Sequence, residues 1–225
     1  MVVSKCAVYF CAKMIYNTHK GKQRRDVSMT KTEQLDKMTE KNNGYLFTSE
    51  VVDAGISKTY LSKFVKANKF ERAVQGIYVS DETWIDELYV IQKSNPNLIF
   101  DSDTALYLHG LTDREYSKIH VSVPKGYNTF RLKKKGFIIH TYDIELYQMG
   151  ICDVESNYGN LLKAYDKERA ICDMVAGRGE VESQVYQTAM KEYMSDSEKK
   201  LNVLLTYAEK MGLRDEIMKY LEVML

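Results

Sequence analysis

The N-terminal third of the chain contains two short helical segments separated by one glycine, and two alternating segments follow directly. Gly55 ends the first helical segment, and Ser57 supplies a side-chain oxygen suited to cap the second. Residues 70–74 and 77–80 alternate as strands do, and the two residues Gln75-Gly76 between them make a hairpin turn. This order predicts a helix, a sharp turn, a second helix and a hairpin, which is the arrangement of a winged helix-turn-helix.

The preceding residues predict one more helix and one short strand. Thr30 and Glu33 have the spacing of a capping box, and an Asn-Asn-Gly run supplies the stop near residue 44. Residues 45–47 have strand composition. Thr48 or Ser49 is then expected to cap the next helix.

The helix that runs from Ser57 to about Asn68 has two contrasting faces. Leu61, Phe64 and Val65 share an apolar face, and the opposite face is basic and rich in hydroxyl groups. Such a face suits DNA phosphates and base edges, so we expect this helix to lie in the major groove and the hairpin to lie along the backbone. The predicted DNA-binding residues are Lys58, Thr59, Tyr60, Ser62, Lys63, Lys66, Lys69, Arg72 and Gln75.

Two other interpretations of this face stay open. A lysine-rich helix face is also typical of an ordinary solvated surface. Helix-turn-helix shapes also occur in proteins that bind other proteins, and a protein-binding adaptor would show no salt-dependent affinity for DNA.

The remainder of the chain predicts an α+β fold. A helix is expected over Trp84–Ile91, a short strand over 98–100 and a helix from Asp101 to His109. Strand composition returns in three further segments, which are Ile119–Val123, Phe137–His140 and Leu161–Tyr165. From Asp166 to the end the pattern is helical, with breaks expected at Gly177-Arg178-Gly179, Ser195–Ser197 and Gly212. We therefore expect a winged helix-turn-helix over 29–80, and a mixed α/β domain over 81–225 that ends in a C-terminal helical bundle.

Residues 1–28 differ from the rest in being basic and without a clear helical or strand period. The run Gln23-Arg24-Arg25-Asp26 can be encoded by a ribosome-binding sequence, so a native start at Met29 and a translated leader before it is one hypothesis. A disordered basic arm that adds non-specific DNA affinity is the other.

A second basic segment lies in the middle of the chain. Residues 118–140 carry six Lys or Arg and no Asp or Glu, with Tyr127 and Phe130 interleaved. The segment is suited to contact phosphates or to dock an acidic partner, and a solvated loop is an equal alternative. The residues of this possible second basic surface are Lys118, Lys125, Arg131, Lys133, Lys134 and Lys135.

Several polar groups have the residue types of a chemical site. Asp101 and Asp103 have a spacing that a metal could use, but carboxylates at a helix start are more often caps. His109, His120 and His140 are scattered singly, which favours half-buried or surface histidines over ligands. The Asp166, Glu168, Arg169 and Asp173 group could be an acidic cluster, but at these spacings ion pairs and helix-start charge explain it as well.

No phosphate-binding glycine loop, nucleophile elbow or HExxH motif is present. We therefore expect no catalysis, no metal and no cofactor. The enzyme alternative predicts a nucleic-acid-directed, metal-dependent activity that Asp101→Ala or Asp166→Ala abolishes.

The chain has four cysteines and no CxxC pair, which predicts free thiols in the cytoplasm. It has no apolar run of about 18 residues, so no membrane partner is expected.

The sequence resembles the AbiEi-family antitoxins of type IV toxin–antitoxin systems, which act in phage abortive infection. The resemblance rests on motifs in both halves. These are Gly55-Ile56-Ser57, Leu61, Phe64-Val65, Phe70-Glu71-Arg72, Gly76-Ile77-Tyr78, Asp103–Thr112, Ile119–Pro124, Gly126–Asn128 and Tyr165–Asp173. The match spans essentially Met29 to Leu225.

The resemblance implies an autorepressor and antitoxin that is not an enzyme. Its winged helix would bind inverted repeats in double-stranded operator DNA upstream of its own operon, as a monomer in solution that pairs on DNA. Its C-terminal domain would counteract a co-encoded nucleotidyltransferase-like toxin without forming a stable complex.

Overall fold

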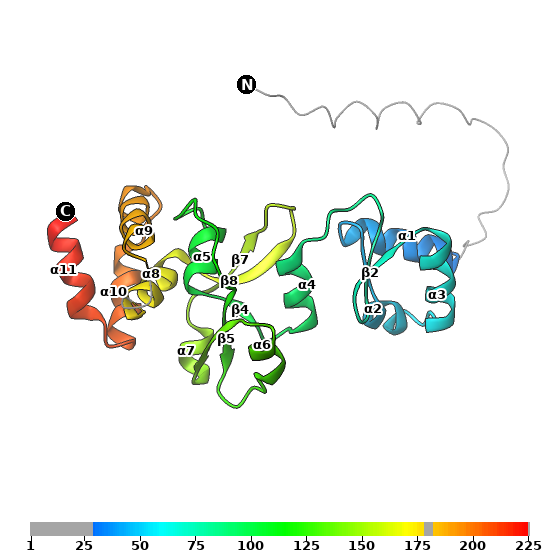
Figure 1. Cartoon of the computed structure of the whole chain (residues 1–225), viewed down its shortest axis with the longest axis horizontal. Coiled ribbons are helices and arrows are strands. Elements are labelled where there is room, and N and C mark those ends of the chain that lie inside the picture. Colours follow the sequence, from blue (N-terminus) through cyan, green and yellow to red (C-terminus); the bar gives the residue numbers. More distant parts are fainter. Residues whose placement is uncertain (1–28, 178–181, 225) are drawn as a thin grey trace, which may run out of the picture.

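The structure is a computed structural model that describes residues 29–177 and 182–224. The hypotheses for residues 1–28 and the predicted break at Arg178-Gly179 lie outside the described residues. In Figure 1 the elements follow the chain along the long axis, from α1–β3 at one end, through a central sheet, to the helices α8–α11 at the other. No helix in the described ranges has the length and apolar character needed to cross a membrane.

The N-terminal unit contains the elements expected for residues 29–80. The elements are α1 (Lys31–Lys41), β1 (Tyr45–Phe47), α2 (Thr48–Asp53), α3 (Lys58–Ala67), β2 (Glu71–Val74) and β3 (Ile77–Val79). The strands form an antiparallel sheet in the order β1-β3-β2. Thr30 and Glu33 make the predicted capping box, and Ser57 caps α3 through the backbone N–H of Tyr60.

The predicted cap of α2 is wrong. The helix begins at Thr48 without any side-chain cap, and the residue before it is Phe47. The reason is that the Thr48 N–H is used by the sheet, because it donates to the Gly76 carbonyl at the hairpin turn at 2.8 Å. In this helix Val51 is buried, whereas Val52 is 42% exposed.

A small core holds the three helices of this unit together. Leu35 of α1, Leu46 of β1, Ile56 of the turn and Leu61 of α3 are all 2% exposed or less. Burial of a Leu or Ile side chain contributes about 1.5–3 kcal/mol each. The core therefore fixes which face of α3 stays in solvent.

The next helix starts later than expected. We predicted Trp84–Ile91, but α4 spans Glu87–Ser94, and Trp84 is 83% exposed. Asp86 sets the start because its carboxylate accepts from the Tyr89 N–H at 3.0 Å, which caps the helix.

A five-stranded mixed sheet forms the centre of the molecule, in the order β6-β5-β4-β8-β7. Its strands are β4 (Ile99–Phe100), β5 (His120–Pro124), β6 (Ile138–Tyr142), β7 (Ile151–Glu155) and β8 (Leu161–Tyr165). The pairs β5–β6 and β4–β8 are parallel, and β4–β5 and β7–β8 are antiparallel. Together with the flanking helices, this sheet makes the fold a mixture of helices and sheets, consistent with the α+β class.

Three elements of this region were not predicted. The helix α5 (Ser102–Leu108) was expected, but α6 (Phe130–Lys134), α7 (Ile144–Gln148) and β7 were not. The two helices are only five residues long, which is too short to show a helical period in sequence. The four C-terminal helices were expected, and they are α8 (Lys167–Ala176), α9 (Ser183–Ser195), α10 (Leu201–Lys210) and α11 (Arg214–Met224).

The two faces of the sheet are covered differently. One face packs against α4 and α6 through an apolar cluster that also contains Tyr45, Phe47 and Val79 of the N-terminal sheet. This core thus crosses the boundary that the sequence placed at residue 80. The other face carries polar side chains beneath α8, and α5 and α8–α11 share a separate apolar cluster.

A buried carboxylate connects the N-terminal unit to the central sheet. Asp86 is 2% exposed. Its side chain accepts from Ser156 Oγ at 2.5 Å and from Asn160 Nδ2 at 2.9 Å, in the turn between β7 and β8. Its backbone N–H donates to the Tyr45 hydroxyl at 2.7 Å. One residue therefore links α4, the β7–β8 turn and β1.

We predict that Asp86→Ala lowers the free energy of unfolding by about 2–3 kcal/mol, because it removes a helix cap and leaves buried donors without an acceptor. Chemical denaturation of the full chain measures the change. The exposed neighbour Glu87 provides the control, since Glu87→Ala should change stability by about 0.5 kcal/mol or less. Equal effects of the two substitutions would contradict the assignment.

Candidate nucleic-acid interface

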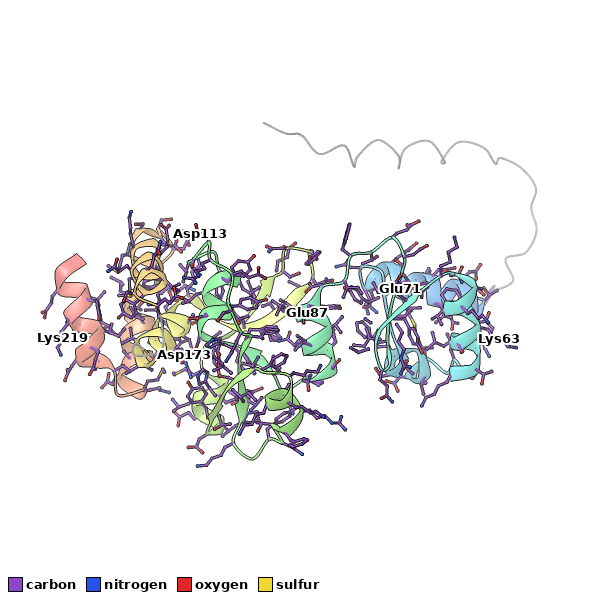
Figure 2. The ribbon with its side chains drawn as sticks, viewed as in Figure 1. Lys63, Glu71, Glu87, Asp113, Asp173 and Lys219 are labelled. Carbon is purple, nitrogen blue, oxygen red and sulfur yellow. The ribbon has the colours of Figure 1, made fainter. Side chains whose placement is uncertain are left out.

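The helix α3 presents the predicted basic face to solvent. Leu61, Phe64 and Val65 are buried against the unit's core. The opposite side of the helix is exposed at Lys58, Thr59, Ser62, Lys63 and Lys66. In Figure 2, Lys63 lies at the outer end of the molecule, at the opposite end from Lys219 of α11. The face is therefore accessible to a large partner.

The lysines of this face make no ion pair with any other described residue. Within the residues that the structure describes, the recorded salt bridges include none from Lys58, Lys63 or Lys66. An anionic partner could thus bind these three ammonium groups without first breaking an ion pair inside the protein.

Tyr60 differs from the other predicted contacts on α3. Its hydroxyl lies 2.8 Å from Thr32 Oγ1 of α1, and the Lys31 ammonium lies over its ring at 5.8 Å from the centroid. The side chain is half-buried. Tyr60 is therefore placed to hold α3 against α1.

The hairpin carries the remaining predicted contacts. Lys69 precedes β2, Arg72 lies on β2, and Gln75 lies in the turn, and all three are exposed. Since β2 is the edge strand of its sheet, Arg72 has no strand beyond it in this part of the structure. Lys69 and Arg72 thus extend the basic character of α3 onto the hairpin.

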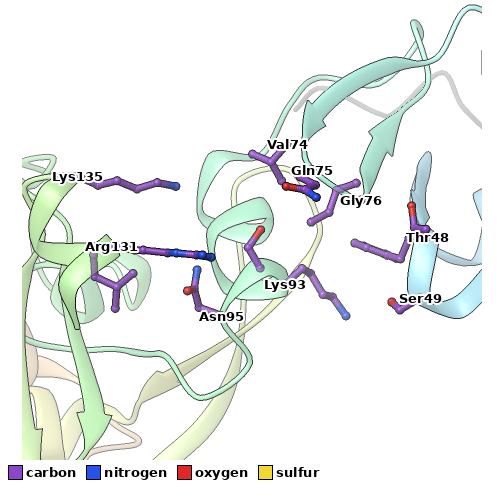
Figure 3. A pocket seen from close by; sticks show the side chains of 13 residues that line it. Thr48, Ser49, Val74, Gln75, Gly76, Lys93, Asn95, Arg131 and Lys135 are labelled. Carbon is purple, nitrogen blue, oxygen red and sulfur yellow. The ribbon is translucent and has the colours of Figure 1, made fainter. Parts of the chain in front are cut away.

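A groove of about 750 Å³ separates the hairpin turn from the central sheet. Gln75 and Gly76 form one wall, and Arg131 and Lys135 reach toward them from α6 (Figure 3). Lys93 of α4 also lines the groove, at 5.3 Å and 5.1 Å from the ring centroids of Phe47 and Tyr89. The structure therefore brings part of the second basic segment to the hairpin.

Lys93 was not among the residues predicted from the sequence. It lies in an otherwise acidic stretch, in the last turn of α4, and nothing local indicated a neighbouring basic group. The remaining members of the second basic segment are divided. Lys118, Lys133 and Lys134 are exposed away from the lining of the groove, and Lys125 is paired with Asp143 at 3.3 Å.

A second group of polar residues lies on the face of the central sheet beneath α8. Asp101 was expected to cap α5, and it occupies the cap position, but its side chain makes no capping hydrogen bond. Instead one carboxylate oxygen, Oδ2, accepts from Ser122 and lies 2.9 Å from His140 Nδ1. The prediction that the Asp101 side chain caps α5 is therefore wrong, because its carboxylate points along the sheet toward Ser122 and His140.

Strand register explains why these residues meet. Alternate residues of a strand share a face, so His120 and Ser122 of β5 point the same way. His140 of β6 pairs directly with Ser122, and the Asp101 N–H donates to the His120 carbonyl at 3.2 Å. Asp101, His120 and His140 thus form a row across three adjacent strands.

The helix α8 covers this row with a buried ion pair. Arg169 is fully buried, and its Nε donates to Asp173 Oδ1 at 3.0 Å. The guanidinium also donates to the Leu146 carbonyl at 2.7 Å and stacks on Tyr142 and Tyr165, with centroid distances of 4.7 Å and 4.5 Å. The expected ion pairing of this segment is confirmed. The structure also shows that Asp166 caps α8, because its side chain accepts from the Arg169 N–H.

Burial changes the protonation chemistry of this layer. Desolvation raises the pKa of Asp173, nearby Arg169 opposes that rise, and the Asp101 charge adds to it. Burial also raises the pKa of the Tyr142 hydroxyl, which donates to Asp173 Oδ1. His109 is separate from this row, because its Nε2 lies 2.7 Å from the Tyr165 carbonyl, and burial lowers its pKa.

No protein-family model and no curated protein matches the chain. Among solved structures it is similar to the Rv2827c protein from Mycobacterium tuberculosis, with a TM-score of 0.50 and 11% sequence identity. The similarity covers 77% of this chain and 70% of that one. At this identity the likeness concerns the fold alone.

We predict that Arg169→Ala lowers the free energy of unfolding by about 3–5 kcal/mol, because it leaves the Asp173 carboxylate buried without its cation. Adding Asp173→Asn should recover part of this loss, since the double variant buries no uncompensated charge at that position. Denaturation of the two variants and the wild type measures both quantities. A double variant no more stable than Arg169→Ala alone would contradict this account.

Proposed function

We propose that the chain is a DNA-binding transcriptional regulator whose residues 29–80 form a winged helix-turn-helix. In this proposal α2 and α3 are the helix-turn-helix, and the β2–β3 hairpin is the wing. The observation that carries the proposal is the exposed face of α3, where three lysines that make no ion pair among the described residues lie beside two hydroxyl side chains. That composition suits phosphates and base edges together.

In this proposal the predicted contacts have different tasks. Lys58 and Thr59 are at the N-terminal end of α3, where recognition helices usually read base edges. Ser62, Lys63 and Lys66 continue the same exposed face toward bases or phosphates. Lys69 and Arg72 would follow the backbone beside the wing, and Tyr60 would position α3 through Thr32.

The groove beside the wing supports a further phosphate contact. Lys93, Arg131 and Lys135 line it, and Gln75 faces them from the turn. A duplex that extends past the wing would meet these three charges, which would add to affinity without adding to sequence recognition.

We predict that Lys63→Ala weakens binding to every DNA sequence to a similar degree and reduces the slope of log affinity against log salt by about 1. The measurement is a gel shift with DNA from immediately upstream of the gene, over a range of salt concentrations. Lys191→Ala is the matched control, because Lys191 is an exposed lysine on α9 at the far end of the molecule. Equal binding to upstream and random DNA would remove the regulator proposal in favour of a protein-binding role.

The resemblance to AbiEi-family antitoxins supports a more specific proposal. The chain would repress its own operon by binding inverted repeats, with one copy on each arm. Residues 81–225 would counteract a co-encoded nucleotidyltransferase-like toxin without a stable complex. This role places DNA binding and neutralisation on separate surfaces, which fits the position of α3 at one end of the molecule.

We predict that the two activities separate. Full-length chain carrying Lys58→Ala, Lys63→Ala and Lys66→Ala should lose repression of its own promoter and still rescue growth of cells that express the adjacent toxin gene. A promoter fusion and a growth assay measure the two properties in the same strain. Loss of rescue in a variant that is folded and present at wild-type level would show that neutralisation needs the DNA-binding face.

A further inference from the structure

We propose that Asp101, His120 and His140 form a binding site for one divalent transition-metal ion such as Zn²⁺ or Fe²⁺. One carboxylate and two imidazoles are the donor set of many metal sites that retain open positions for water or substrate. This site lies outside the surfaces assigned to DNA.

The three side chains are already close together. One potential ligand atom from each of the three lies within 4.8 Å of the other two, and His140 Nδ1 is 2.9 Å from Asp101 Oδ2. Donor atoms that share an ion at roughly 2.0–2.2 Å lie about 3–3.5 Å apart. Modest rotation of the imidazoles would therefore complete the site while the three strands stay in register.

Asp101 supplies the independent sign of a ligand. Its side chain is fully buried, yet within the described part of the chain Oδ1 has no hydrogen-bond partner. A buried carboxylate oxygen without a donor costs free energy, and a cation is the partner that best removes this cost. The neighbouring residue Ser102 has a φ of 41°, a left-handed conformation that holds Asp101 at the end of β4 at some cost in strain.

The surrounding charge also favours a cation. The carboxylates of Asp103 and Asp173 line the same cavity as the two histidines. The only buried guanidinium beneath α8 in the described ranges is that of Arg169, which is paired with Asp173. Asp103 Oδ2 lies 3.8 Å from His120 Nε2, where it can orient the imidazole from outside the ligand set.

The cavity gives an ion a path to solvent. Its volume is about 330 Å³, and its lining includes Ser102, Ser117, His120 and His140. Three protein ligands leave at least one coordination position, and the cavity is the side from which water or a small anionic ligand would reach it.

The test is a titration of metal-free full-length chain with Co²⁺ alone and with Zn²⁺ alone, followed by absorption spectroscopy and calorimetry. We expect one ion per chain, a Co²⁺ spectrum of nitrogen and oxygen ligands without a thiolate band, and a melting temperature that rises with Zn²⁺ concentration. Asp101→Asn, His120→Gln and His140→Gln should each weaken binding by about 100-fold or more, since even outer-shell partners of ligands account for 10–100-fold.

The matched control is His109→Gln, which changes a half-buried histidine that faces the Tyr165 carbonyl instead of this row. It should bind the ion as the wild type does. The proposal is overturned if wild-type chain takes up no ion at micromolar concentrations, or if all four variants bind alike. A thiolate band in the wild-type spectrum would also overturn it, by placing the ion at a cysteine, and this readout does not depend on whether any variant folds.

Discussion

The position of the basic helix depends on one buried carboxylate at the joint between the two sheets. Asp86 caps α4 and binds Ser156 and Asn160 of the β7–β8 turn, and its own N–H meets the Tyr45 hydroxyl. Asn43 adds a direct bond from the α1–β1 turn to the Gly159 carbonyl. The charge-assisted bonds to Ser156 and Asn160 anchor Asp86 to the central sheet. The bonds of the N-terminal unit to Asp86 and to Gly159 then hold that unit at one orientation relative to the sheet. That orientation fixes the groove beside the hairpin and points α3 away from the rest of the chain.

Local signals in the sequence were sufficient for most of the N-terminal unit, because capping, glycine breaks and helical period act within a few residues. Thr30, Ser57 and the Gln75-Gly76 turn all appear where such rules place them. The same rules failed where a distant contact decided the outcome. The start of α2 depends on the Gly76 carbonyl, and the side chain of Asp101 turns from its helix toward Ser122.

The histidine row shows this limit most clearly. His120 and His140 are twenty positions apart, and each looks like an ordinary half-buried histidine in its own strand. Only the parallel pairing of β5 with β6, in which Ser122 faces His140, brings them to Asp101. Strand composition was visible in the sequence, but register was not, because nothing local distinguishes a parallel neighbour from an antiparallel one.

The exposed position of Trp84 has a consequence for optical work on this protein. It is the only tryptophan of the chain, it is 83% exposed, and its carbonyl accepts from the Tyr45 hydroxyl at the joint. Indole emission therefore originates at one point, on the segment between the basic helix and the central sheet. Quenching and anisotropy of that emission would show, without any attached dye, whether the two units move as one body or tumble separately.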